Sequence, residues 1–81
     1  MRVTVRLFAR LRDIAGESTL HRELSDGSTA RALWNSLEAE HMELAGYRDA
    51  VSTAINEEYA KMDHALSDGD EVAFLPPVSG G

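Results

Sequence analysis

The sequence predicts an α+β domain in which one main helix packs on a mixed sheet of about five strands. Two segments, residues 2–8 and 71–75, alternate apolar and polar side chains, which is typical of strands with one buried face. Between them, residues 29–41 carry apolar side chains at helical spacing. Because 81 residues bury one modest core, we expect a single domain, residues 1–75, followed by an extended tail, residues 76–81.

The N-terminal half leads from the first strand to the main helix. The valines and Leu7 share one side of the first strand, whereas Phe8 lies on the other. Residues 11–16 predict a short helical turn ended by glycine, and residues 18–24 a second strand. Ser28 is the expected N-cap of the main helix. The apolar stripe of that helix is expected to cover one face of the sheet and consists of Ala30, Leu33, Trp34, Leu37 and His41.

The C-terminal half supplies the remaining strands. Residues 42–49 are expected to form a polar connection, and Glu57-Glu58 to form a turn. The expected strands are residues 50–56, 59–61 and 71–75. If the first and last strands lie side by side in the middle of the sheet, two strand pairs flanking one helix form the β-grasp, or ubiquitin-like, arrangement.

Composition and charge exclude several classes of function. The net charge is −6 and the pI is about 4.8, so phosphate backbones and anionic membranes repel the chain, and neither nucleic acid nor a membrane is an expected partner. The absence of cysteine excludes disulfides, zinc–thiolate sites and a cysteine nucleophile. No apolar run is typical of a membrane span or a signal peptide, so we expect a cytoplasmic protein.

No side chain is predicted to be catalytic. The three histidines, His21, His41 and His64, match no metal-ligand spacing, so no metal site is expected. Acidic residues gather before the last strand without the order of a calcium-binding loop, and Asp68-Gly69-Asp70 is more simply a tight turn. No Walker-type phosphate loop is present, so we expect no bound cofactor, and any ATP belongs to a partner.

The chain ends in Gly80-Gly81, a carboxylate on a backbone without Cβ atoms. Such a terminus can enter a channel too narrow for other residues. Pro76 and Pro77 hold the preceding chain extended, and the tail from Pro76 can reach roughly 20 Å at about 3.3 Å per residue. This geometry predicts a protein whose reactive group is its own C-terminal carboxylate. The alternative is that the two glycines are only a frayed chain end without a function.

Phe8 and Leu75 are the candidate partner-binding residues. Both are expected on the sheet face that the helix leaves uncovered, where neighbouring first and last strands would place them in one exposed apolar patch. Aromatic residues are frequent anchors of protein interfaces. The alternative is that Phe8 packs under the following turn, against Leu11 or Ile14.

Three segments together resemble one family. Residues 63–81, residues 5–13 followed by Gly16, and Ala54-Ile55-Asn56 are similar to the small subunit of molybdopterin synthase, the MoaD family of MoaD/ThiS-like sulfur carriers. The resemblance covers the whole chain, although Ala65 stands where the family often has proline.

The resemblance implies a sulfur-donor subunit that is not itself catalytic. The Gly81 carboxylate would be adenylated by an ATP-using, MoeB-like enzyme similar to ubiquitin activators, and then converted to a thiocarboxylate. The tail would enter a MoaE-like large subunit, with a heterotetramer expected, and give its sulfur to cyclic pyranopterin monophosphate during molybdenum cofactor synthesis. The inserted residues would be Pro76, Pro77, Val78, Ser79 and Gly80.

Three other functions stay open at this point. A sulfur carrier for thiamine thiazole or another sulfur pathway would share the fold, the tail and the activation chemistry. A ubiquitin-like modifier would join the same activated glycine to lysines of other proteins. If the protein is instead a purely structural binding module, the glycine tail has no chemical role. This alternative predicts no adenylation when ATP and an activating enzyme are supplied.

Overall fold

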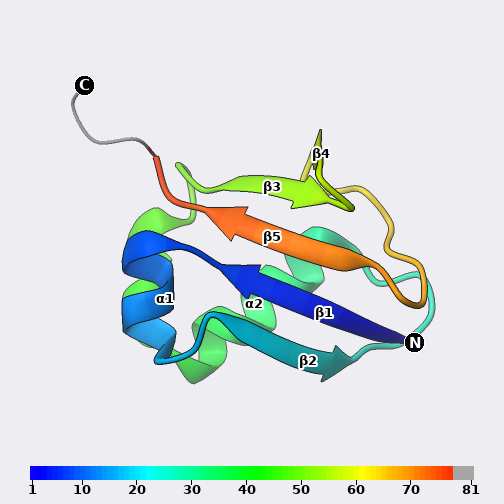
Figure 1. Cartoon of the computed structure of the whole chain (residues 1–81), viewed down its shortest axis with the longest axis horizontal. Coiled ribbons are helices and arrows are strands. Elements are labelled where there is room, and N and C mark those ends of the chain that lie inside the picture. Colours follow the sequence, from blue (N-terminus) through cyan, green and yellow to red (C-terminus); the bar gives the residue numbers. More distant parts are fainter. Residues whose placement is uncertain (78–81) are drawn as a thin grey trace.

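In the computed structural model, which describes residues 1–77, five strands form one mixed sheet with the main helix across one face (Figure 1). The strand order is β2-β1-β5-β3-β4. Along the chain the elements are β1 (Arg2–Leu7), α1 (Ala9–Ala15), β2 (Thr19–Glu23), α2 (Ala30–Glu40), η1 (Met42–Tyr47), β3 (Ser52–Ile55), β4 (Glu58–Ala60) and β5 (Glu71–Leu75). The predicted α+β class and β-grasp arrangement are confirmed.

The first and last strands are neighbours at the centre of the sheet, as the sequence predicts. β1 and β5 pair in parallel, from Thr4 opposite Glu71 to Leu7 opposite Phe74. On its other side β5 pairs with β3 in antiparallel fashion, as far as Ser52 opposite Leu75. β5 is therefore held on both sides, and the C-terminal tail leaves the domain from a fixed central strand.

The core lies between α2 and the inner face of the sheet. Trp34 of α2 meets Phe74 of β5 edge to face, with ring centroids 5.1 Å apart. The other buried apolar residues are Val3, Val5, Leu7, Leu11, Leu20, Ala30, Leu33, Leu37, Leu44, Ile55, Leu66 and Val72. The predicted stripe of α2 is confirmed apart from His41, which is half-buried because it caps the end of the helix.

The N-cap of α2 is Thr29, and the prediction of Ser28 is wrong. The Thr29 side chain accepts a hydrogen bond from the Ala32 backbone nitrogen at 3.2 Å. Ser28 belongs to the preceding turn, where its backbone nitrogen bonds the carbonyl of Ser25 at 3.1 Å. Both residue types can cap a helix, so the turn decides which of the two does so.

Two predictions for the segment after α2 are also wrong. The expected polar connection contains the short helix η1, and its Leu44 is fully buried. The expected turn at Glu57-Glu58 lies one residue earlier, because Asn56 and Glu57 take left-handed conformations with φ of 51° and 72° and Glu58 already belongs to β4. In the part of the chain that the structure describes, no helix is long and apolar enough to cross a membrane.

Candidate functional site

The outer face of β5 carries the side chains next to the tail. Val72 and Phe74 point into the core, so Glu71, Ala73 and Leu75 point to the opposite face, which α2 does not cover. Beyond Leu75 the chain continues through a half-buried Pro76 and an exposed Pro77. The remaining predicted tail residues, Val78, Ser79, Gly80 and Gly81, lie outside the described residues.

Phe8 and Leu75 line the same shallow hollow on this outer face. The hollow has a volume of about 270 Å³. Its centre is apolar and its rim is charged, and the lining residues are Arg6, Phe8, Ala54, Glu57, Tyr59, Glu71, Ala73 and Leu75. We call it the β5 hollow. The structure thus brings the two candidate partner-binding residues together beside the start of the tail, and their role in binding stays a prediction.

The backbone before α1 fixes the position of Phe8. Phe8 is extended, with φ of −122° and ψ of 152°, and its carbonyl accepts the Leu11 nitrogen at 3.0 Å as the first turn of α1 begins. The Arg6 guanidinium lies 5.6 Å from the centre of the Phe8 ring, within cation–π range. Phe8 remains 38% exposed and lies outside the buried core. Its ring therefore stays available to a partner.

Charged and polar groups form the rim of the β5 hollow. Arg6 and Glu71 form a loose ion pair, with 3.8 Å between nitrogen and oxygen, which salt and water weaken. Tyr59 on β4 is 82% exposed. A polar rim around an apolar centre is the usual anatomy of a protein interface.

Asn56 joins the β3–β4 hairpin to the start of β5. Its backbone nitrogen donates to the Glu71 carbonyl at 2.8 Å, and its side-chain oxygen accepts the Glu71 nitrogen at 2.9 Å. Its side-chain nitrogen donates to Asp70 Oδ1 at 2.9 Å. These contacts hold Glu57 and Tyr59 at the rim. Sequence reasoning missed this role, although asparagine is one of the residues that tolerate the left-handed conformation of such a turn.

The acidic residues before β5 accept hydrogen bonds from backbone nitrogens. Asp68 Oδ1 accepts the Arg2 backbone nitrogen at 2.7 Å, and Asp70 Oδ2 accepts the Ser67 nitrogen at 2.8 Å. Both carboxylates therefore stabilise the turn that leads into the last strand. Among residues 1–77, the structure groups no three histidine or acidic side chains in a way that could hold a metal ion.

A carboxylate with an altered pKa lies on α2, away from the residues that line the β5 hollow. Hydrogen bonds from Arg48, with Nη2 2.6 Å from Oε1, lower the pKa of Glu38, whereas burial acts in the opposite direction. The indole nitrogen of Trp34 also donates to Glu38. This carboxylate links the core helix to the segment after η1, so its altered pKa reflects a structural contact.

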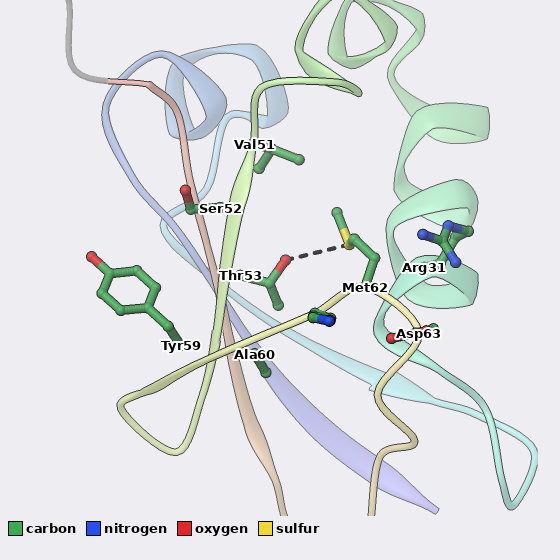
Figure 2. A pocket seen from close by; sticks show the side chains of 9 residues that line it. Arg31, Val51, Ser52, Thr53, Tyr59, Ala60, Met62 and Asp63 are labelled. Carbon is green, nitrogen blue, oxygen red and sulfur yellow. Dashed lines mark hydrogen bonds between the residues drawn. The ribbon is translucent and has the colours of Figure 1, made fainter.

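A larger hollow of about 490 Å³ opens between β3, the end of β4 and the start of α2 (Figure 2). The Thr53 hydroxyl points into it and donates to the sulfur of Met62 at 3.3 Å. Thr53 is only 3% exposed, and this contact provides a partner for its buried hydroxyl. We call this the edge hollow. Its lining residues are Arg31, Val51, Ser52, Thr53, Tyr59, Ala60, Lys61, Met62 and Asp63.

Comparisons with known sequences give consistent matches over the whole chain. The model of the ThiS family matches residues 5–81. A Chlamydomonas reinhardtii protein named molybdopterin synthase sulfur carrier subunit is 39% identical over 83 residues, which cover 100% of both chains. An Escherichia coli K12 protein of the same name is 36% identical, covering 98% of this chain and 99% of the relative. The small archaeal modifier protein 3 of Haloferax volcanii is 34% identical, with 100% of both chains covered.

Solved structures agree with the fold. The crystal structure of SAMP1 from Haloferax volcanii matches with a TM-score of 0.86 and 30% identity, over 100% of both chains. A chain in the complex of subunits 1 and 2 of molybdopterin-converting factor from Helicobacter pylori matches with a TM-score of 0.69 and 27% identity, again over 100% of both chains. The second match shows that a relative of this chain assembles with a protein partner.

Proposed function

We propose that this chain, which belongs to the ThiS family, is the sulfur-carrier small subunit of molybdopterin synthase. Full-length similarity to proteins of that name supports the proposal. The observation that carries it is the course of the chain after β5. The central strand ends at Leu75 beside the β5 hollow, and Pro76-Pro77 lead on to the terminal Gly80-Gly81.

Activation of the terminus comes first, because a free carboxylate repels nucleophiles and has no good leaving group. A Gly81 carboxylate oxygen attacks the α-phosphorus of ATP, pyrophosphate leaves, and an acyl-adenylate forms. Sulfide, supplied by the donor, then attacks the carbonyl carbon and AMP leaves, so that a thiocarboxylate remains at Gly81. The sequence has neither a Walker-type phosphate loop nor a cysteine. We therefore assign the ATP site and the sulfur donor to partners, the first of them a MoeB-like adenylyltransferase.

Delivery to the large subunit follows. The loaded tail enters a MoaE-like subunit within a heterotetramer, and the thiocarboxylate sulfur attacks a carbon of cyclic pyranopterin monophosphate as an oxygen substituent leaves that carbon. Water then hydrolyses the resulting thioester, so that the sulfur stays on the pterin and Gly81 regains its carboxylate. Glycines at the last two positions let the backbone pass where a Cβ would not fit. The thiocarboxylate is itself the nucleophile, so the carrier needs no thiol. Because the activation needs ATP and the chain has no cysteine, we propose a cytoplasmic location for this chemistry.

The folded domain provides the surface that a partner binds. The β5 hollow offers a partner an apolar centre with Phe8 at one side and Leu75 at the other. A partner that binds there lies directly beside the emerging tail. Binding energy gained at the hollow can therefore be used to position the terminal carbonyl, which reacts at another place.

Deleting Gly81 tests the proposal. The shortened chain should fold with an unchanged melting temperature, because residues 1–77 contain the whole described core, and it should transfer no sulfur. Sulfur transfer is measured as pterin product formed with ATP, an activating enzyme, a sulfur donor and the large subunit. Glu17→Gln, an exposed change outside the tail and the β5 hollow, is the matched control and should retain transfer. Full transfer by the chain without Gly81 would falsify the mechanism.

A ubiquitin-like modifier is the second candidate function. The observation that favours it is the similarity to small archaeal modifier protein 3. Both functions begin with the same adenylate and differ in the acceptor, since a modifier forms an amide with lysines of other proteins. Mass spectrometry of cell lysates for Gly81 joined to such lysines distinguishes the two. A sulfur carrier for thiazole synthesis shares the chemistry, and co-purification with a large subunit separates it from molybdopterin synthase.

A further inference from the structure

Most cationic side chains of this chain are paired with carboxylates. The chain has eight lysine and arginine residues and fourteen aspartate and glutamate residues. In the described part, residues 1–77, two of these cations, Arg31 and Lys61, form no ion pair. The paired cations are Arg2, Arg6, Arg10, Arg12, Arg22 and Arg48. The two remaining cations are therefore available to a negatively charged group of another molecule.

Both unpaired cations line the edge hollow, although they come from different elements. Arg31 lies in the first turn of α2, and Lys61 follows the end of β4. Both residues are exposed. Figure 2 shows Arg31 on the helix across the hollow from β3, with Met62 between them. The sheet edge and the helix thus bring two positive charges to one hollow of about 490 Å³.

The start of α2 adds to the positive potential of the edge hollow. The N-terminal end of a helix carries a partial positive charge, and an arginine in the first turn adds to it. The first turn of α2 contains no acidic residue that would balance Arg31. The backbone nitrogens of Ala30 and Arg31 already donate to the carbonyls of His64 and Met62, at 3.1 and 2.8 Å. A ligand of this site therefore meets the Arg31 side chain and not free backbone groups.

One carboxylate, that of Asp63, also lines the edge hollow. It forms no ion pair with Arg31 or Lys61 within residues 1–77. The charges that line the hollow leave it net positive, whereas the whole chain has a net charge of −6. At physiological ionic strength, charges more than about 8 Å apart are largely screened. For a short ligand the local charge therefore decides, and the hollow favours an anion.

From this arrangement we infer that the edge hollow binds an acidic, extended segment of a partner protein, whose carboxylates contact Arg31 and Lys61. β4 is the last strand of the sheet, so within residues 1–77 no strand pairs with its outer edge. An extended segment can lie along such an edge. Its apolar side chains can pack on the apolar part of the lining, which consists of Val51, Ala60 and Met62.

Other anionic occupants fit the hollow less well. A single exposed ion pair contributes little to affinity, so a small anion such as phosphate makes too few contacts to be held. A long polyanion such as a nucleic acid also meets the acidic surface outside the hollow, which repels it. A second copy of this chain carries the same net charge of −6 and is repelled as well. A short acidic segment combines several contacts at one place and avoids both difficulties.

The edge hollow is continuous with the β5 hollow, because Tyr59 lines both. A partner that covers the β5 hollow can therefore place an acidic segment around β4 and into the edge hollow. The inference goes beyond the proposed function and does not depend on it, since no step of it uses the C-terminus of the chain.

The test uses the full-length, isotope-labelled chain and a short synthetic peptide of alternating glutamate and valine residues. The peptide is added stepwise, and the backbone amide signals of the chain are followed by NMR. We expect saturable shifts around Arg31, Ser52, Tyr59 and Lys61. The dissociation constant should rise when the ionic strength is raised from about 0.01 M to about 0.15 M. A peptide of the same length with glutamine in place of glutamate should bind roughly 4- to 25-fold more weakly, because it loses both ion pairs.

Charge variants with matched controls locate the binding site. Arg31→Gln and Lys61→Gln should each raise the dissociation constant by about 2- to 5-fold. Arg12→Gln removes an exposed cation outside the hollow, with the same change in net charge, and should have little effect. Asp63→Asn should lower the dissociation constant by about 2- to 5-fold, because it removes the carboxylate that lines the hollow, whereas Glu17→Gln should not. The amide spectrum of each variant shows directly whether it is folded.

Several results would overturn the inference. Shifts confined to other parts of the domain would place the peptide elsewhere. An equal loss of affinity in Arg12→Gln and in the two hollow variants would reduce the effect to net charge. Equal affinity for the glutamine peptide would exclude charge recognition, and equal affinity for inorganic phosphate would indicate a small-anion site instead of a protein docking site. The absence of any saturable shift with the acidic peptide would refute the inference outright.

Discussion

Replacing Phe8 with alanine is expected to weaken binding to the large subunit by about 10- to 30-fold. In the free chain Phe8 is 38% exposed. For a phenylalanine surface of roughly 200 Å², about 75 Å² is left for a partner to bury. At about 25 cal/mol per Å², this area contributes about 2 kcal/mol, which corresponds to roughly 30-fold in Kd. Alanine retains part of the contact, and this sets the lower end of the range.

Isothermal titration calorimetry with the purified large subunit measures this change. Circular dichroism at the titration temperature establishes that each variant is folded, as expected because Phe8 lies outside the buried core. Phe8→Leu is the matched control, since it keeps most of the apolar surface and should lose less affinity than Phe8→Ala. A folded Phe8→Ala variant with an unchanged Kd would refute the assignment of the β5 hollow as the docking surface.

Three further predictions concern the helix caps, acid stability and the tail. Thr29→Ala should lower the free energy of unfolding by about 1 kcal/mol in urea titrations and Ser28→Ala by less, and equal losses would contradict the cap assignment. Arg48 lowers the pKa of Glu38 in the folded chain, so this contact adds stability that is complete above the ordinary glutamate pKa and is lost as the pH falls through the lower folded-state value. Glu38→Gln should therefore be less stable than the unmodified chain at neutral pH, and the difference should shrink in strong acid, whereas a constant difference would exclude the linkage. Gly80→Ala should slow sulfur transfer at an unchanged melting temperature, because its methyl group crowds a narrow channel, and normal kinetics would rule out that channel.

Periodicity was enough to predict the parts of the fold that carry a continuous pattern. The alternation around Val3 and Val72 predicted the two central strands, and the spacing of Leu33 and Leu37 predicted the main helix. These segments bury one face over several residues, so their pattern reports their structure directly. The pairing of the first and last strands followed from the order of the elements.

Short segments and polar contacts could not be predicted in the same way. Leu44 is buried by a helix too short to show a period, and Thr53 is a buried polar residue satisfied by Met62, a contact that only the folded chain creates. Ser28 and Thr29 are both capable caps, and the preceding turn decides between them.

The candidate site was predicted in part. The alternation of the first strand predicted that Phe8 lies on the uncovered face, and the structure places it beside Leu75 in the β5 hollow. The rim was missed because Glu57 and Tyr59 come from a hairpin whose position depends on hydrogen bonds between Asn56 and β5. Those hydrogen bonds join residues far apart in the sequence, so no local sequence pattern predicts them.

Intact-mass spectrometry of the chain purified from its native cells tests the central claim most directly. If the C-terminus is the reactive group, part of the protein should be heavier by the exchange of one oxygen for sulfur, and fragmentation should locate that exchange at Gly81. Protein that carries an unmodified carboxylate throughout, in cells that contain an activating enzyme and ATP, would contradict the account.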